Sequence, residues 1–155
     1  MRRIAIILSL AAVVLLCCQC AKSPYQLAKK GAKSVPFTTL EHYYVRNNAA
    51  SNHVQRLILD TKEDFEAYFG EGAVMGGMPT DINWRRQYVI ALLLPVTNKQ
   101  TMITPKEVKQ SPGNVIFYYQ VITGRKTQYT LVPFIAIALE RSEEPQQLQV
   151  FYIEK

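Results

Sequence analysis

The first twenty residues place the tightest limit on the fold, because they do not have the composition of a folded body. Met1-Arg2-Arg3 is followed by Ile4 to Leu16 without one charged residue, and all three cysteines lie between residues 17 and 20. A basic start followed by an apolar run of about 7–15 residues is typical of a bacterial secretory signal. A membrane-spanning helix needs about 20 apolar residues, so this run is short for one. The body must therefore fold from the residues after Cys20, without a disulfide.

The cysteine at the end of the apolar run resembles the acylation site of bacterial lipoproteins. That pattern has Leu or Val at position −3 and a small residue at −1, and Cys18 matches it best, with Leu15 and Cys17 there; Cys20 is the alternative. The resemblance implies a signal peptide over residues 1–17 and a thiol that carries a diacylglycerol. A zinc site would need four ligands, and the three clustered cysteines supply one too few.

The segment after the cysteines separates the expected anchor from the body. Residues 18–36 hold four lysines, small residues and two prolines, which predicts an acylated N-terminus followed by a flexible linker. Residues 37–155 are long enough for a single domain with its own core. Removing Arg2 and Arg3 with the signal lowers the net charge from +6 to +4. That charge is too small for a nucleic-acid surface, so we expect no nucleic-acid partner.

The hydrophobic pattern of the body predicts an α+β fold with a mostly antiparallel sheet of about seven strands, curled or sandwich-like, and one short helix. Residues 37–46 and 53–60 are expected to form a hairpin, and residues 60–70 the helix. Asp60 or Thr61 is expected to cap this helix, Phe65 to lie on its apolar face and Gly70 to end it. Residues 87–95 are almost entirely apolar, as in a strand covered on both faces. Ser111-Pro112-Gly113-Asn114 predicts a type II turn, and a further turn is expected near residues 124–128.

Aromatic and arginine side chains are the candidates for a binding surface, because these residue types are enriched at interaction hot spots. Neighbours on a strand point to opposite faces, so one tyrosine of each adjacent pair, Tyr43-Tyr44 and Tyr118-Tyr119, is expected to be exposed. The residues expected to contact a partner are Trp84, Arg85, Arg86, Tyr43 and Tyr118.

The body shows no pattern of a catalytic, cofactor or metal site. His42 and His53 are expected to lie too far apart to share a metal, and the glycine-rich segment 70–83 lacks the ending of a phosphate-binding loop. That segment is nevertheless the most favourable place for a functional loop. Asp81, Glu107 and Glu140 could serve acid–base chemistry, although their spacing does not single them out.

Residues 55–155 resemble the C-terminal domain of the PrcB-type protease-complex lipoproteins. The resemblance rests on the order of a strand and short helix, "LILDTKEDFEAYF", a loop and strong apolar strand, "PTDINWRRQYVIALLL", and two later strands, "NVIFYYQVIT" and "YTLVPFIAIALE". It implies a small exported module that assists a protease or another envelope protein and has no activity of its own.

Together these features predict a lipoprotein of the bacterial cell envelope, anchored on the periplasmic or surface side, that is not an enzyme and binds an envelope protein. The alternative is a periplasmic carrier that holds a small apolar or peptide ligand in the mouth of a curled sheet. A hydrolase that depends on carboxylates is the third hypothesis.

Overall fold

The computed structural model describes residues 23–72, 77–142 and 148–155. Within them the chain is mostly antiparallel sheet and forms a sandwich, which confirms the predicted α+β class. The elements are α2 (Pro24–Lys29), β1 (Lys33–Ser34), β2 (Thr38–Thr39), β3 (Tyr43–Val45), a 3-10 turn (Asn47–Ala49), β4 (Gln55–Leu59), α3 (Lys62–Tyr68), β5 (Phe69–Glu71), β6 (Gln87–Leu93), β7 (Thr97–Ser111), β8 (Asn114–Leu131), β9 (Phe134–Glu140) and β10 (Gln149–Glu154).

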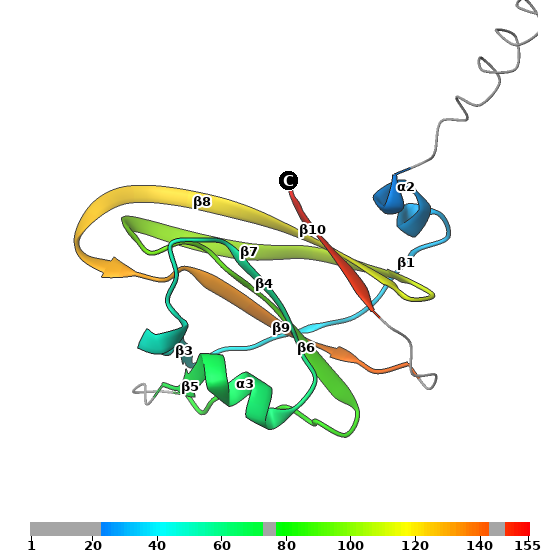
Figure 1. Cartoon of the computed structure of the whole chain (residues 1–155), viewed down its shortest axis with the longest axis horizontal. Helices are drawn as coiled ribbons and strands as arrows, with labels where there is room; N and C mark the ends of the chain where they lie inside the picture. Colours follow the sequence, from blue (N-terminus) through cyan, green and yellow to red (C-terminus); the bar gives the residue numbers. More distant parts are fainter. Residues whose placement is uncertain (1–22, 73–76, 143–147) are drawn as a thin grey trace, which may run out of the picture.

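Two four-stranded sheets form the body (Figure 1). Sheet A has the order β1-β7-β8-β10, with β10 parallel to β8, and sheet B has the order β2-β9-β6-β4. A two-stranded ribbon, β3-β5, lies beside α3 on the far side of sheet B. The four strands β1, β2, β3 and β5 are only two or three residues long, so the described residues contain more strands than sequence patterns indicate.

The two inner strands of sheet B, β6 and β9, are buried on both faces, which explains the apolar run of β6. Tyr88, Ile90 and Leu92 pack between the two sheets, against residues such as Phe117 and Tyr119 of β8. Val89, Ala91 and Leu93 point the other way, toward α3 and the β3-β5 ribbon. Because successive side chains alternate between faces, a strand covered on both sides has no polar positions.

The predicted hairpin over residues 37–46 and 53–60 is wrong. β3 pairs with β5, placing Tyr43 opposite Glu71, whereas β4 pairs with β6. The expected turn near residues 124–128 is also wrong, because β8 continues from Asn114 to Leu131. The chain turns instead at Val132-Pro133, where proline cannot donate to the ladder.

Two local predictions are confirmed. Thr61 caps α3, accepting a hydrogen bond from the Asp64 amide at 3.1 Å. The β7–β8 hairpin turns at residues 111–114, and Gly113 has a φ of 71°, the left-handed value required at the third position of a type II turn. Gly70 does not end α3. It lies in β5 under the ring of Tyr44, which leaves no space for a Cβ atom.

Residues 24–34, expected to lie in the linker, contain α2 and β1. Ser23 caps the helix and Pro24 occupies its first position, both favourable at a helix start. Ala28 is buried against Ile116 and Tyr118 on the outer face of sheet A, and β1 pairs with β7. The described part of this segment is therefore packed on the body.

Candidate functional site

A cavity of about 450 Å³ opens beside α3, on the side of sheet B that faces away from sheet A. It lies within the range of about 300–1,000 Å³ that is usual for ligand pockets. The helix, the β3-β5 ribbon and the segment before β6 supply its walls, namely Tyr43, Arg46, Lys62, Phe65, Glu66, Phe69, Gly70, Glu71, Asp81, Ile82 and Trp84. We call this cavity the aromatic pocket.

The floor of the aromatic pocket is a cluster of four rings centred on Phe65. The ring of Phe65 meets Tyr43 edge-on at 5.0 Å, stacks on Phe69 at 4.8 Å and tilts against Trp84 at 5.6 Å. Phe65 and Phe69 are buried, whereas Tyr43 and Trp84 are half-buried and line the opening. The two partly exposed rings are therefore fixed in place by a rigid apolar base.

Backbone pairing and one hydrogen bond hold Tyr43 at the rim. Its partner in the β3-β5 ribbon is Glu71, and its hydroxyl donates to the Thr80 carbonyl oxygen at 2.8 Å. Burial raises the pKa of the Tyr43 hydroxyl, and the nearby carboxylates of Glu71 and Asp81 raise it further. Both carboxylates therefore lie close enough to the Tyr43 hydroxyl to disfavour its ionised form.

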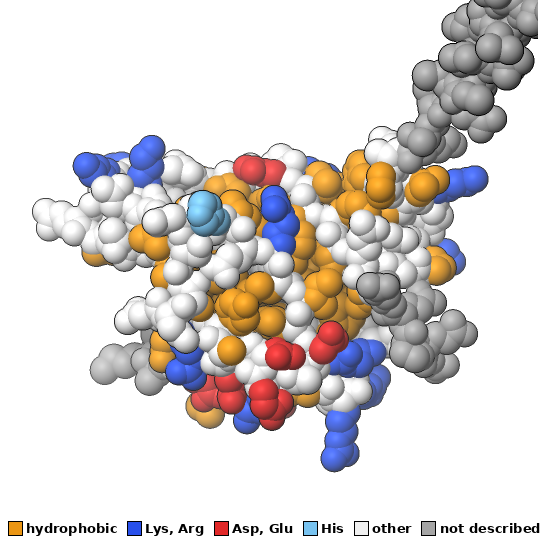
Figure 2. Space-filling model, viewed as in Figure 1, with side chains coloured by type: hydrophobic (Ala, Val, Ile, Leu, Met, Phe, Trp, Pro, Cys, Tyr) orange, Lys and Arg blue, Asp and Glu red, His pale blue; other side chains and the backbone are white. Residues whose placement is uncertain are grey.

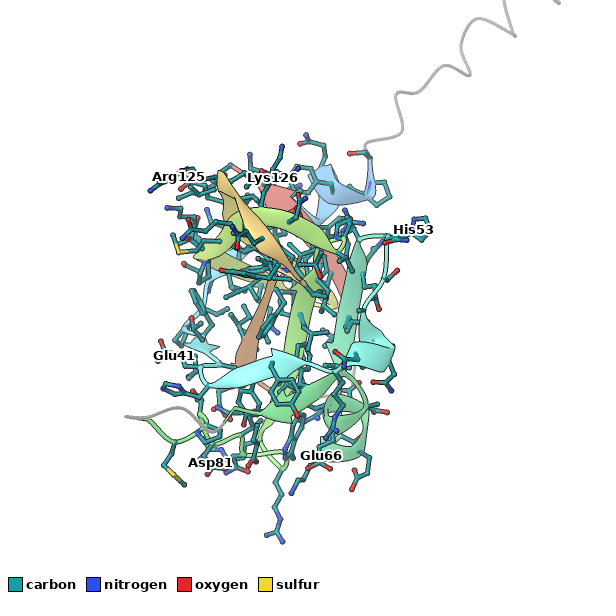
Figure 3. All side chains as sticks on the ribbon, turned by 90° about the vertical axis from the view of Figure 1, so that its left-hand side faces the viewer. Glu41, His53, Glu66, Asp81, Arg125 and Lys126 are labelled. Atoms are coloured by element: carbon teal, nitrogen blue, oxygen red, sulfur yellow. The ribbon has the colours of Figure 1, made fainter. Side chains whose placement is uncertain are left out.

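The charges around the opening leave two carboxylates without an ion pair. Lys62 pairs with Glu66 at 3.5 Å, and the Arg46 side chain donates to the Phe69 carbonyl oxygen at 3.1 Å. Among the residues that the structure describes, neither Glu71 nor Asp81 forms a salt bridge. Acidic side chains gather over α3 in Figure 2, and Figure 3 places Glu66 and Asp81 at the same end of the molecule.

This arrangement suits a cationic group. The faces of Trp and Tyr rings attract Lys or Arg within about 6 Å, and unpaired carboxylates strengthen the attraction. A guanidinium or ammonium group entering beside Trp84 and Tyr43 would meet Glu71 and Asp81.

The structure separates the residues that the sequence grouped as partner-binding. Tyr43 and Trp84 both line the aromatic pocket. Arg85 and Arg86 are exposed outside it, and Arg86 pairs with Glu140 at 3.6 Å. Tyr118 is only 5% exposed, so its predicted role at a binding surface is wrong, because α2 covers the face of sheet A to which it points. Cys18 and Cys20 lie outside the described residues.

The expectation of one exposed tyrosine in each pair holds for one pair only. Tyr44 is 50% exposed while Tyr43 is half-buried. Tyr118 and Tyr119 are both buried, one under α2 and the other between the sheets. The two side chains do point to opposite faces of β8, but at this place both faces of the strand are covered.

Sequence reasoning missed Phe65 and Glu71 as site residues. The helical pattern puts Phe65 on the apolar face of the helix, which predicts its burial but does not indicate a pocket. Glu71 reaches the site because β5 pairs with β3, and the expected hairpin hid that pairing. The sequence offers Asp81 as a candidate for acid–base chemistry alone.

The remaining candidates lie apart from this site. The ring of His42 lies against Gly77, while His53 lies in the loop before β4, at the other end of the molecule from Asp81 (Figure 3). Glu107 lies on β7, within 3.4 Å of Lys109 and 3.7 Å of Lys155. In the described ranges, no group of three or more His, Cys, Asp or Glu side chains has a geometry that could hold a metal ion.

The comparisons with known proteins give no relative. No family model, no curated protein and no solved structure matches the chain. The resemblance to the PrcB-type lipoproteins therefore stays a prediction. No helix among residues 23–72, 77–142 and 148–155 has the length and hydropathy needed to cross a bilayer.

Proposed function

We propose that this chain is a lipoprotein of the bacterial cell envelope, acylated on Cys18 or Cys20, whose body binds a partner protein without catalysing a reaction. The aromatic pocket carries the proposal, because it presents Tyr43 and Trp84 over the buried rings of Phe65 and Phe69. Beside them lie the carboxylates of Glu71 and Asp81, which form no salt bridge within the described ranges. The partner contributes a Lys or Arg side chain, which these groups hold by cation–π and charge attraction.

The alternative of a ligand carrier draws less support from the packing. A carrier of the expected kind would hold its ligand in the mouth of a curled sheet, whereas the space between sheets A and B is filled by buried side chains such as Ile90, Leu92, Ile137 and Phe117. The aromatic pocket opens on the surface beside α3, where a protein surface can cover it.

Site-directed photo-crosslinking in the envelope tests the proposal. A photoreactive amino acid at Glu66, on the rim, should form one discrete adduct with a partner protein. The same amino acid at Tyr129, which is 64% exposed on β8, should not form that adduct. Trp84→Ala and the pair Glu71→Gln with Asp81→Asn should each abolish the adduct from position 66.

The adduct then supplies a direct binding assay. Trp84 is the only tryptophan of the chain, so its fluorescence reports occupation of the aromatic pocket. The Lys- or Arg-containing segment identified in the adduct should change that fluorescence on titration, and a version with Gln in place of the basic residue should bind at least tenfold more weakly. An adduct that persists in all the pocket variants would contradict the proposal.

A further inference from the structure

The packing of α2 sets how far the body can lie from an acyl anchor. Its N-cap is Ser23, only three residues after Cys20 and five after Cys18. A fully extended chain spans about 3.3–3.6 Å per residue, so the tether measures at most about 10 Å from Cys20 or about 17 Å from Cys18. Because α2 packs on the outer face of sheet A, the anchor would hold that face close to the lipid headgroups.

The charges of the chain are segregated toward this layer. Residues 23–36 and 97–131, which form α2, β1, β7 and β8, contain eight Lys and Arg and a single acidic residue, Glu107. The Glu107 carboxylate forms salt bridges with Lys109 and Lys155. β10, the fourth strand of sheet A, ends with Glu154 and is followed by Lys155, so it leaves the net charge of the layer unchanged. The remaining described residues carry eight acidic and six basic side chains. Only the layer of sheet A and α2 is therefore strongly cationic.

Apolar side chains are exposed on the same layer. Leu27 of α2 and Met102 of β7 are each 58% exposed, and Ile122 of β8 is 47% exposed. Met102 and Ile122 are cross-strand partners. Ile122 is an even number of residues from Ile116 and Tyr118, so it lies on the face that α2 covers further along β8. Beyond α2, this outer face therefore exposes Met102 and Ile122, with Gln120 and Thr104 between them and α2.

The basic end of β8 and the aromatic pocket lie at opposite ends of the molecule. Figure 3 shows Arg125 and Lys126 on the upper side of the molecule and Glu66 and Asp81 on the lower side. Figure 1 shows α2 on the same upper side, near the start of β8. A bilayer that contacted the outer face of sheet A would leave the aromatic pocket directed away from it, open to a partner.

We propose that the outer face of sheet A, around Leu27, Met102 and Ile122, lies against the anionic surface of the membrane in which the chain is anchored. The proposal rests on the lipid anchor of the proposed function and adds the orientation of the body. Apolar side chains enter the headgroup region while Lys99, Arg125 and Lys126 meet lipid phosphates, as on other interfacial protein surfaces. The short tether keeps this face within about one or two Debye lengths of those charges.

Quenching of tryptophan by brominated lipids tests the orientation. The acylated full-length chain, with Trp84→Phe as background, is placed in nanodiscs of brominated phosphatidylethanolamine and phosphatidylglycerol. Ile122→Trp reports the proposed contact, and Tyr44→Trp on β3 is the matched control, since Tyr44 is also about half exposed but lies on the far layer. Ile122→Trp should be quenched several-fold more strongly than Tyr44→Trp.

Charge reversal tests the electrostatic part. Arg125→Glu with Lys126→Glu should reduce the quenching of Ile122→Trp at least twofold, whereas Arg85→Glu with Arg86→Glu, an equal change at exposed positions near the aromatic pocket, should leave it unchanged. Discs of brominated phosphatidylcholine alone should also give weaker quenching.

The outcomes separate this proposal from the proposed function. Intact mass confirms acylation in each sample. If the two tryptophans of an acylated chain are quenched equally, the proposed membrane contact of sheet A is wrong. The same follows if neither charge reversal nor lipid composition changes the quenching. In both cases the lipid anchor itself is not contradicted. A chain that carries no acyl group overturns the proposed function, and the membrane face with it.

Discussion

Two tyrosines lie in the core between sheets A and B, and loss of the hydroxyl group should change the free energy of unfolding in opposite directions at the two positions. The Tyr152 hydroxyl, on β10 of sheet A, donates across the sandwich to the carbonyl oxygens of Leu57 at 2.9 Å and Ala91 at 3.2 Å. The Tyr88 hydroxyl, on β6, is buried without a hydrogen-bond partner among the described residues. Tyr152→Phe should therefore lower the free energy of unfolding by about 1–2 kcal/mol, whereas Tyr88→Phe should raise it by up to about 1 kcal/mol.

Urea unfolding of both variants in one detergent, followed by the fluorescence of Trp84, measures the difference as a shift in midpoint at constant slope. A second readout is alkaline pH. Burial, with a contribution from Asp60 opposed by Arg141, raises the pKa of Tyr88 from 10.0 to about 12. The folded protein therefore loses stability as the pH rises from about 10 to about 12, and Tyr88→Phe should reduce that loss. The reasoning is refuted if Tyr88→Phe costs more than about 1 kcal/mol, or if Tyr152→Phe costs nothing.

Three further substitutions test other parts of the fold. Phe65→Ala removes the centre of the aromatic cluster and should cost about 3–5 kcal/mol in urea unfolding, against about 0.5 kcal/mol or less for the exposed control Tyr129→Ala; equal costs would contradict the packing. Gly113→Ala forces a side chain into left-handed backbone and should cost about 1–2 kcal/mol, visible as a lower thermal midpoint; an unchanged midpoint would contradict the turn. Burial raises the pKa of Glu107, but Lys109, Ser34 and Lys155 outweigh it and bring the pKa below its ordinary 4.5, so its contribution is present above that pH and is lost as the pH falls through the folded value. Glu107→Gln should therefore reduce the loss of unfolding free energy that the protein shows as the pH falls below about 4.5. An unchanged dependence on pH in this range would argue against these contacts.

The sequence predicted the elements whose pattern is local. Thr61 as a cap, Phe65 on the inner face of a helix and the turn at Pro112-Gly113 each depend on a few neighbouring residues, and each is found. The continuous apolar run of β6 also indicated correctly a strand covered on both faces. These features follow from local residue propensities and from the spacing of apolar residues, both of which can be read from the sequence alone.

Strand partners and covering segments could not be read in the same way. β3 and β4 are neighbours in sequence, but β3 pairs with β5, which places Tyr43 and Val45 against the buried cluster of Phe65 and Phe69. The polar composition of residues 21–36 gave no sign that Tyr25 and Ala28 pack on the body, because their burial depends on the outer face of sheet A. The sequence therefore named Tyr43 and Trp84, which line the aromatic pocket, but it did not indicate Glu71 and it placed Tyr118 at the surface, where the structure has it buried.

Intact-mass analysis of the mature chain, purified from membranes, tests the central claim of a lipid-anchored envelope protein most directly. The account predicts a polypeptide that begins at Cys18, or at Cys20, and carries the added mass of fatty acyl chains, and a Cys-to-Ala change at that position should remove this mass and release the chain from the membrane fraction. A mature chain of unmodified mass that fractionates away from membranes would contradict the account.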